Sequence, residues 1–195
     1  GETMIKVLEE RAFPVSQFYA LASSRSLGKD VSFNHKRYPV LDVESFDFRQ
    51  ADIGLFSAGG EISRIYAPKA AAAGCVVIDN TSEFRYDDDI PLVVPEVNPH
   101  AIGQYKTRGI IANPNCSTIQ MLVALKPIYD AVGITRINVA TYQSVSGAGK
   151  EAVQELAEQT VELVSGRGPV KARVISRQIA FNCVPHIDTF LDNGY

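Results

Sequence analysis

The stretch Gly-Ile-Ile-Ala-Asn-Pro-Asn-Cys-Ser-Thr, residues 109–118, joins a strand pattern to a helix pattern. Residues 109–112 form a short apolar run, which predicts a buried strand. Beyond Ser117, apolar residues recur at the spacing of one helix face: Ile119, Leu122, Val123 and Leu125. Cys116 is therefore expected at the first turn of a helix, directly after a strand has ended.

A cysteine in that position has the environment of a nucleophile. The first backbone N–H groups of a helix have no partner within the helix, and together with the helix dipole they favour the thiolate. The alternative is an ordinary buried cysteine, the commoner fate of this residue type. A Pro-Asn turn before Cys116 and two hydroxyl residues after it disfavour that alternative. We therefore predict that Cys116 is a catalytic nucleophile.

The composition argues against several classes of protein. The chain has 195 residues, 46% of them hydrophobic and 21% charged, which is enough to bury a core in one large domain or two small ones. A formal net charge of -3 offers no basic surface for nucleic acid. No apolar run approaches the ~20 residues of a membrane span. The cysteines are odd in number and far apart: Cys75, Cys116 and Cys183. This spacing argues against a disulfide framework or a zinc site, and it favours a location in the reducing cytoplasm.

The first half of the chain alternates short apolar runs with helical patterns, which predicts an α/β fold with a doubly wound, mostly parallel sheet. One helix is expected over residues 2–11. An alanine-rich helix is expected over residues 62–73, kinked at Pro68 and ended by Gly74. The expected strands are residues 18–22, 31–33, 38–41, 53–56, 75–78 and 109–112.

The pattern changes after the helix that follows Cys116. Gly133 is expected to end that helix, and residues 134–142 alternate like a strand with one solvated face. Residues 151–164 predict an amphipathic helix with one apolar stripe: Val153, Leu156, Ala157, Val161 and Val164. We place a domain boundary near Asn113, which gives a dinucleotide-binding domain of residues 1–113 and the beginning of an α+β domain of residues 114–195.

Both ends of the sequence suggest a fragment. A doubly wound domain normally begins with a strand and a glycine-rich turn that leads into the first helix, whereas this chain opens on the helix. Residues 190–195 stop in mid-pattern. The first strand and part of any catalytic machinery are therefore expected outside these residues.

Several segments together resemble the aspartate-β-semialdehyde dehydrogenases. Residues 113–118 resemble the segment that carries the nucleophile of that family. Five further segments follow the family's order across essentially the whole chain: Ser-Ser-Arg-Ser-Leu-Gly-Lys (23–29), Ser-Ala-Gly-Gly (57–60), Asp-Asn-Thr-Ser-Glu-Phe-Arg (79–85), Pro-Glu-Val-Asn (95–98) and Tyr-Gln-Ser-Val-Ser-Gly-Ala-Gly (142–149). One such segment alone would be weak evidence, but the ordered set makes chance agreement improbable.

The resemblance implies a Rossmann-type NADP-binding domain joined to a catalytic and dimerisation domain, with the complete protein a homodimer or a dimer of dimers. It implies the NADPH-dependent reductive dephosphorylation of L-aspartyl-4-phosphate to L-aspartate 4-semialdehyde and phosphate. That step feeds the biosynthesis of lysine, diaminopimelate, methionine, threonine and isoleucine. The family's general acid/base histidine and further basic residues come from beyond residue 195, so these residues alone are expected to be inactive, and none of the three histidines here is assigned that role.

The resemblance also implies roles for individual residues. Cys116 would form the acyl-thioester, and Gln143 would contact the substrate. The remaining roles are phosphate binding by Arg85 and Asn115, contact with the adenosine phosphate by Arg25 and Ser26, and lining of the nicotinamide site by Ser146 and Gly147.

Two arginines can also be weighed on their own chemistry. A guanidinium suits a leaving phosphate, and Arg85 follows a strand end, where ligands of open α/β sheets collect. Without the family, a surface Arg85 paired with an aspartate of residues 87–89 is the simpler interpretation. Arg25 follows the second strand of the domain, where a carboxylate would select NAD and an arginine accommodates NADP. A plain polar turn remains the alternative there.

Small-residue turns supply the other candidate contacts. Ser57 and Gly59, like Ser146 and Gly147, stand in turns at strand ends, where backbone can approach a cofactor closely. Each could also be a simple turn. Gln143 ends an apolar and aromatic strand pattern, and a buried amide there would require a polar partner such as the substrate.

Two other functions remain open at this point. One is another acyl-phosphate reductase, such as N-acetylglutamyl-phosphate reductase or a phosphorylating glyceraldehyde dehydrogenase. The other is a non-catalytic relative that keeps the fold as a binding or dimerisation module. The context of residues 115–118 and the spacing to Gln143 favour the aspartyl enzyme, and the presence of Cys116 favours an enzyme.

Overall fold

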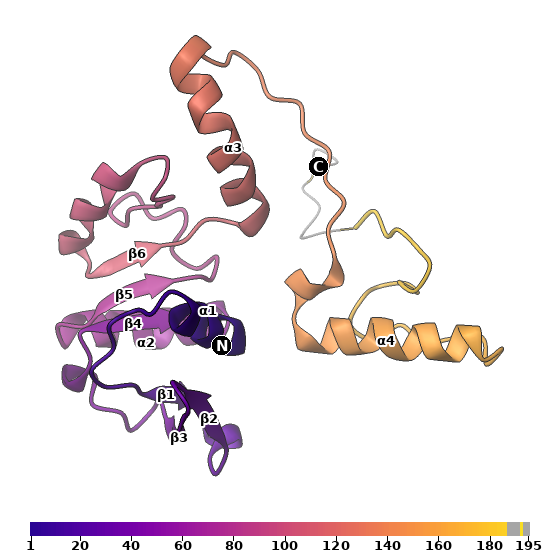
Figure 1. The fold of residues 1–195 in the computed structure, drawn as a ribbon, viewed down its shortest axis with the longest axis horizontal. Helices are drawn as coiled ribbons and strands as arrows, with labels where there is room; N and C mark the ends of the chain where they lie inside the picture. Colours follow the sequence, from indigo (N-terminus) through magenta and orange to yellow (C-terminus); the bar gives the residue numbers. More distant parts are fainter. Residues whose placement is uncertain (187–191, 193–195) are drawn as a thin grey trace. The chain divides into compact units, whose positions relative to one another are not determined.

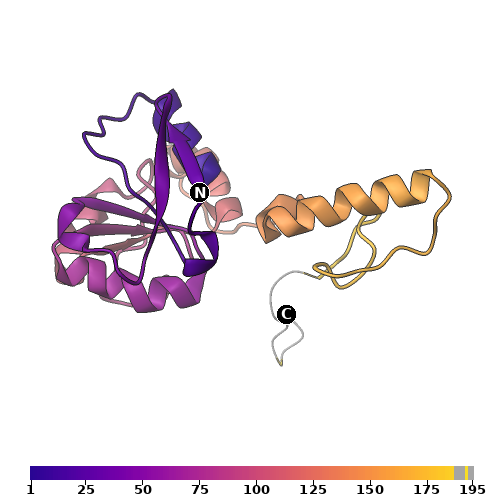
Figure 2. The same ribbon diagram turned by 90° about the horizontal axis from the view of Figure 1, so that it is seen from below.

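A parallel sheet, in the order β4-β5-β6, forms the centre of the N-terminal part of the chain. Its strands are β4 (Ile53–Phe56), β5 (Val76–Asp79) and β6 (Ile110–Ala112). Phe56 pairs with Asp79, and Asp79 pairs with Ala112, so the strands end level with one another. Helix α2 (Gly60–Ala72) connects β4 to β5 and packs against the sheet (Figures 1 and 2). All three carboxyl ends therefore meet at one edge of this sheet.

A second sheet has the order β1-β3-β2. β1 (Ala20–Ala22) runs parallel to β3 (Lys36–Asp42), and β2 (Asp30–Phe33) pairs with β3 as an antiparallel hairpin. Asn34 and His35 form the hairpin turn with φ of 48° and 62°, and positive φ is what a tight hairpin turn requires. The side chain of Glu9 in helix α1 (Glu2–Glu10) accepts a hydrogen bond from the Asn34 backbone N–H at 2.6 Å.

This architecture confirms the predicted α/β class with a parallel, Rossmann-type sheet. The structure is a computed structural model that describes residues 1–186 and residue 192. It divides into two compact units, residues 1–135 and 136–195. The predicted strand 53–56 and the stop at Gly74 occur as expected, while β1 is shorter than predicted. The domain boundary near Asn113 stays a prediction.

The core of the first unit lies between α2 and the parallel sheet. Its buried members include Ala67, Ala70, Val77 and Ile110. Small alanine side chains on α2 let the helix approach the sheet closely. Gly109, at the start of β6, has φ of +69°, and a Cβ there would lie 2.7 Å from the Cβ of Ala71. Glycine is required at this position both by conformation and by space.

We expect Gly109→Ala to destabilise the chain by roughly 2–4 kcal/mol, from left-handed backbone strain plus overpacking against Ala71. Gly28→Ala is a matched control, because Gly28 has φ of +82° but no atom within 4 Å of the added Cβ. The control should lose only about 1–2 kcal/mol, the backbone part. Urea unfolding followed by circular dichroism measures both. Equal losses in the two variants would contradict a collision with Ala71.

Helix α3 (Cys116–Val132) follows β6, as predicted. It begins at Cys116 with Asn115 as its N-cap residue, and it ends at Gly133, whose φ is 71°. Short 3-10 segments complete this unit: Ser24–Ser26, Phe48–Gln50 and Pro99–Thr107.

The second unit contains α4 (Lys150–Val164), which confirms the predicted helix, and the short 3-10 turn Val145–Ala148. Two other expectations are wrong. Residues 134–142 form no strand, because no strand among the described residues pairs with them. The predicted apolar stripe of α4 is not its buried face, since Val161 and Val164 are exposed. The buried positions are Ala152, Glu155 and Gln159.

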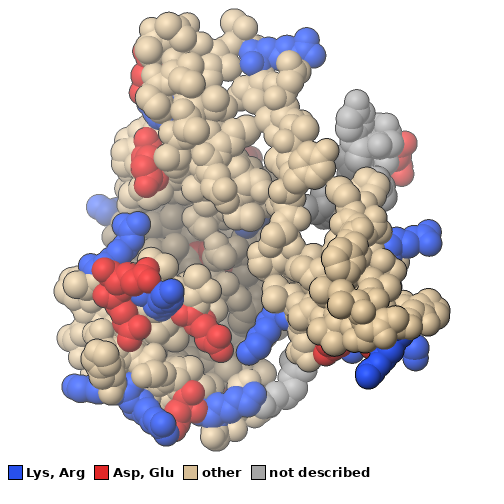
Figure 3. All heavy atoms as spheres, turned by 45° about the vertical axis from the view of Figure 1, so that its right-hand side comes forward, with Lys and Arg blue, Asp and Glu red and all other residues tan. Residues whose placement is uncertain are grey.

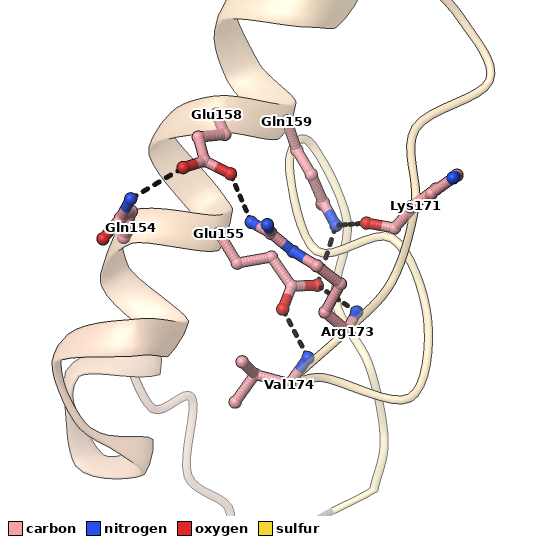
Figure 4. Close-up of polar contacts among 7 residues, drawn as sticks. All are labelled: Gln154, Glu155, Glu158, Gln159, Lys171, Arg173 and Val174. Carbon is pink, nitrogen blue, oxygen red and sulfur yellow. Dashed lines mark hydrogen bonds and ion pairs between the residues drawn. The ribbon is translucent and has the colours of Figure 1, made fainter.

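Glu155 is a fully buried carboxylate, with 0% of its surface exposed. It accepts hydrogen bonds from the backbone N–H of Arg173 at 3.0 Å, from that of Val174 at 2.5 Å, and from the Gln159 amide at 2.9 Å (Figure 4). Burial opposes its ionisation, but the N–H donors of Arg173, Val174 and Ile175 outweigh burial and lower the pKa of Glu155. Through Glu155, helix α4 thus binds the backbone N–H groups of residues 173–175, which form no regular secondary structure.

Gln159 continues this network along the same helix face. Its side-chain oxygen accepts from the backbone N–H of Ile179 at 2.9 Å and of Ala180 at 3.2 Å. Its amide nitrogen also donates to the carbonyl of Lys171 at 3.0 Å, as Figure 4 shows. Residues 171–180 are therefore fixed by polar contacts rather than by a strand ladder.

The pKa of Glu155 is lower in the folded than in the unfolded chain. The ionised carboxylate therefore stabilises the fold fully at any pH above its unfolded pKa of about 4.3. This stabilisation is lost as the pH falls through the lowered pKa of the folded chain. We expect the amides of residues 173–175 to lose hydrogen-exchange protection on acidification below that range. Glu155→Gln should lose this protection already at neutral pH, whereas Glu162→Gln, at an exposed position of the same helix, should behave like the parent. Protection that is independent of pH in the parent would contradict the assignment.

The surface carries both signs of charge. On the face drawn in Figure 3, Lys and Arg side chains are interspersed with Asp and Glu rather than gathered into one field. In the described part of the chain, no helix is both long and apolar enough to cross a membrane.

Candidate active site

The carboxyl edge of the parallel sheet brings two asparagines together. Asn80 follows β5 and Asn113 follows β6, and the Asn113 amide nitrogen donates to the side-chain oxygen of Asn80 at 2.6 Å. The backbone is fixed as well: Asn80 N donates to Phe56 O at 2.8 Å, and Asn113 N donates to Asp79 O at 2.7 Å. The loop that leads to Cys116 therefore leaves the sheet in a defined direction.

Arg85 is anchored to this edge through two main-chain carbonyls. Its Nε donates to the carbonyl of Asn113 at 3.0 Å, and its Nη2 donates to the carbonyl of Asn80 at 3.2 Å. No carboxylate among the described residues forms an ion pair with it. Its guanidinium charge is therefore balanced only by neutral dipoles.

The simpler interpretation of Arg85, pairing with an aspartate of residues 87–89, is wrong. Arg108 takes those partners, at 2.9 Å from Asp89 and 3.9 Å from Asp87. An arginine that is half-buried, held in place and unpaired within the described structure has the properties of an anion-binding group.

Cys116 is the first residue of α3 and its side chain is exposed, so the alternative of a buried core cysteine is wrong. Asn115 caps the helix: its side-chain oxygen accepts from the N–H of Ser117 at 2.9 Å and of Thr118 at 3.4 Å. The cap thus occupies two of the helix N–H donors that the sequence pattern left open, and it uses the Asn115 side-chain oxygen as their acceptor. The Asn115 amide nitrogen keeps its donor capacity.

The other two cysteines differ from each other. Cys75 is 1% exposed, and burial, reinforced by the charge of Asp52, raises the pKa of its thiol, as fits an inert core residue. Cys183, in contrast, is exposed. It lies in an irregular segment, residues 181–186, with no sheet to cover it in the described structure.

The expected cofactor contacts of the first unit lie at strand ends. Ser57 directly follows β4 and is exposed, and Gly59 is the N-cap residue of α2 with φ of 101°, a conformation that favours glycine. Ser26 lies in the 3-10 turn after β1, and its N–H donates to Ser23 O at 2.9 Å. The backbone of Arg25 belongs to the same turn, but its side chain lies outside the described part of the structure.

The expected contacts of the second unit are at its surface. Gln143 is exposed rather than buried, which corrects the prediction, because the strand expected to end at this residue does not form. It borders a hollow of about 580 Å³ that also includes Leu156, Ile179 and Asn182. Ser146 and Gly147 are exposed in the 3-10 turn that follows, where the hydroxyls of Ser144 and Ser146 are 2.7 Å apart.

Sequence reasoning missed Asn80 and Asp79. Asn80 supplies one of the two carbonyls that hold Arg85, and a carbonyl role leaves no signal in residue type. Asp79 is buried at 0% exposure. A charged residue that ends an apolar strand (Cys-Val-Val-Ile-Asp, residues 75–79) could have been recognised as a buried group that needs hydrogen-bond partners.

Comparison with known proteins shows which family this chain resembles. Residues 1–105 match the model of the semialdehyde dehydrogenase NAD binding domain. Residues 125–195 match the model of the semialdehyde dehydrogenase dimerisation domain. The chain belongs to the semialdehyde dehydrogenase family. The resemblance to aspartate-semialdehyde dehydrogenases and the Rossmann-type class are thereby confirmed.

Individual relatives match all or most of the chain. Aspartate-semialdehyde dehydrogenase of a Shewanella species is 65% identical over 195 residues, which are 100% of this chain and 57% of that protein. The crystal structure of aspartate semialdehyde dehydrogenase II from Vibrio cholerae, complexed with ASA, is 66% identical with a TM-score of 0.98, over 100% of this chain and 58% of that one. A Candida albicans aspartate semialdehyde dehydrogenase solved with NADP is 26% identical with a TM-score of 0.58, over 69% of this chain and 44% of that one. The chain thus spans less than two thirds of these relatives.

The burial of the three cysteines predicts their reactivity. We expect iodoacetamide to modify Cys116 and Cys183 in the native chain, whereas Cys75 should react only after unfolding in urea, because its thiol is buried. Peptide mass spectrometry identifies each modified site, and Cys116→Ser serves as the control for its peptide. A native Cys116 as resistant as Cys75 would rule out its role as an accessible nucleophile.

Proposed function

We propose that the complete protein containing this chain reduces L-aspartyl-4-phosphate with NADPH to L-aspartate 4-semialdehyde and phosphate, through an acyl-thioester on Cys116. The observation that carries the proposal is the exposed Cys116 at the start of α3, on the loop whose carbonyl at Asn113 binds Arg85. A nucleophile and an unpaired cation are tied to one sheet edge. The Vibrio cholerae relative in complex with ASA supports the substrate class.

The first step would use the Cys116 sulfur. The thiolate attacks the acyl carbon of the substrate, the new C–S bond forms, the C–O bond to phosphate breaks, and phosphate departs with the electron pair. A covalent intermediate divides one difficult reduction into two easier steps. A nicotinamide held at Ser146 and Gly147 would supply the hydride for the acyl carbon. Cys116 would be regenerated as the thiolate when the C–S bond breaks and its electron pair returns to sulfur.

Arg85 and Asn115 would bind the phosphate group. Two N–H groups of Arg85 are occupied by carbonyls, which orients the guanidinium and leaves Nη1 for the anion. Asn115 uses its oxygen in the cap, which leaves its amide nitrogen as a donor on the same loop as Cys116. Charge-assisted donors aimed at the departing oxygens are what this step requires.

The turns at the strand ends fit a dinucleotide. The residues at Ser57 and Gly59 are small and exposed, and a Cβ at Gly59 would meet no atom within 4 Å, so backbone there is open to a ligand. We propose that they contact the cofactor together with Arg25 and Ser26, which would bind the adenosine phosphate, and that Ser146 and Gly147 line the nicotinamide site. The absence of a carboxylate in residues 23–26, and the Candida albicans relative solved with NADP, support NADP over NAD.

The remaining parts of the proposal concern the complete protein. Gln143 would contact the substrate, and the general acid/base histidine and further basic residues would come from outside residues 1–195. The match to a dimerisation domain supports a homodimer. The widely spaced, odd-numbered cysteines support a cytoplasmic location, and the reaction supports roles in lysine, diaminopimelate, methionine, threonine and isoleucine biosynthesis.

The test is turnover by the complete protein. It should oxidise aspartate semialdehyde with NADP and phosphate, and Cys116→Ser should abolish this activity. Arg85→Lys keeps the charge but loses the geometry of the fork, so the KM for phosphate should rise by about tenfold to a hundredfold, the scale of a hydrogen bond to a charged group. Arg108→Lys is the matched control, because Arg108 is paired with Asp89, and its phosphate KM should not change.

An absence of turnover in the unaltered protein would remove the assignment. An equal effect of the two arginine variants would instead remove only the role of Arg85.

A further inference from the structure

The carboxyl group of Asp79 is fully buried, yet no role in the reaction requires it. Ser63 Oγ on α2 donates to its Oδ1 at 2.9 Å, Thr81 N donates to the same oxygen at 3.0 Å, and Thr81 Oγ1 donates to its Oδ2 at 2.8 Å. All three donors are neutral. Within the described residues, no lysine, arginine or histidine forms an ion pair with Asp79.

These contacts fix a turn rather than a ligand. The bond from Thr81 N to Asp79 closes a turn around Asn80, and Thr81 Oγ1 also accepts from Glu83 N at 3.3 Å, which extends the ordered loop toward Arg85. The bond from Ser63 attaches this turn to helix α2. The direction of the Asn80 carbonyl is therefore set by the side chain of the residue before it.

The second carbonyl that holds Arg85 depends on Asp79 as well. Asn113 N donates to the main-chain oxygen of Asp79 at 2.7 Å, and the carbonyl of Asn113 accepts from Arg85 Nε. The carbonyl of Asn80 thus lies in the turn that the Asp79 side chain closes, and the carbonyl of Asn113 belongs to a residue bound to the Asp79 main chain.

We propose that Asp79 is a positioning residue for Arg85, acting through the turn of residues 79–83 and the carbonyls of Asn80 and Asn113. The proposal rests on the proposed function, in which Arg85 binds phosphate. Asp79 does not touch the substrate; it determines where the guanidinium is held. Loosening the turn lets the guanidinium move, and binding of the phosphate oxygens weakens with its displacement.

The test uses the complete protein and variants of the turn. Thr81→Val keeps the shape of the side chain and removes the hydroxyl that donates to Asp79. We expect the KM for phosphate to rise by about three- to tenfold, the scale of one hydrogen bond, with the KM for NADP unchanged. Thr81→Ser retains the hydroxyl and should restore the parent value. Asp79→Asn and Ser63→Ala should shift the same constant, so the result does not depend on one variant folding.

A purely structural role makes a different prediction. Phe33→Leu removes packing at the buried position of β2 in the other sheet, and should lower the Tm without changing the phosphate KM. The proposal is overturned if the phosphate KM of Thr81→Val is unchanged, or if it rises together with the KM for NADP. It is also overturned if Phe33→Leu raises the phosphate KM as much as Thr81→Val does. Absence of turnover in the unaltered protein would be a failure of the proposed function instead, since the parent then has no phosphate KM to compare.

Discussion

The parallel pairing of β5 with β6 is the constraint on which the site depends. It aligns Asp79 with Ala112, so that the next residues, Asn80 and Asn113, leave the sheet side by side. Because all strands of this sheet run in one direction, the turn that carries Arg85 and the loop that carries Cys116 start from the same edge. Gly109 makes this possible at the other end of β6, where only a residue without a Cβ fits against α2.

Much of the first unit could be predicted because its signals are local. Short apolar runs bounded by Gly, Asn and Ser specify the strands of a parallel sheet, and β4 and α3 occur where the pattern indicated. The position of Cys116 follows from the same local change from strand to helix. The tether of Arg85 could not be predicted, because main-chain carbonyls accept its hydrogen bonds and the competing aspartates belong to Arg108. Neither fact is visible in the spacing of residues.

The second unit shows where periodicity fails. Residues 134–142 alternate like a strand, but alternation produces a strand only where another strand pairs with it, and none does so among the described residues. In α4 the apolar stripe predicted the wrong buried face. Glu155 and Gln159 occupy that face because they satisfy the main chain of an irregular segment. A hydrophobicity pattern counts these residues as polar and assigns them to solvent, although both side chains are buried.

Asp79 and Glu155 share one physical solution, a buried carboxyl group surrounded by neutral donors. At Asp79 this solution has a consequence for the arginine six residues later in the chain. A carboxyl group with unoccupied oxygens at the sheet edge would compete for the guanidinium as a bidentate partner and would neutralise its charge. Ser63 and Thr81 occupy those oxygens instead. Arg85 is then left on two neutral carbonyls, which fix its position without cancelling its charge. A fixed, uncancelled positive charge at the sheet edge from which the loop to Cys116 starts is what the proposed departure of phosphate requires.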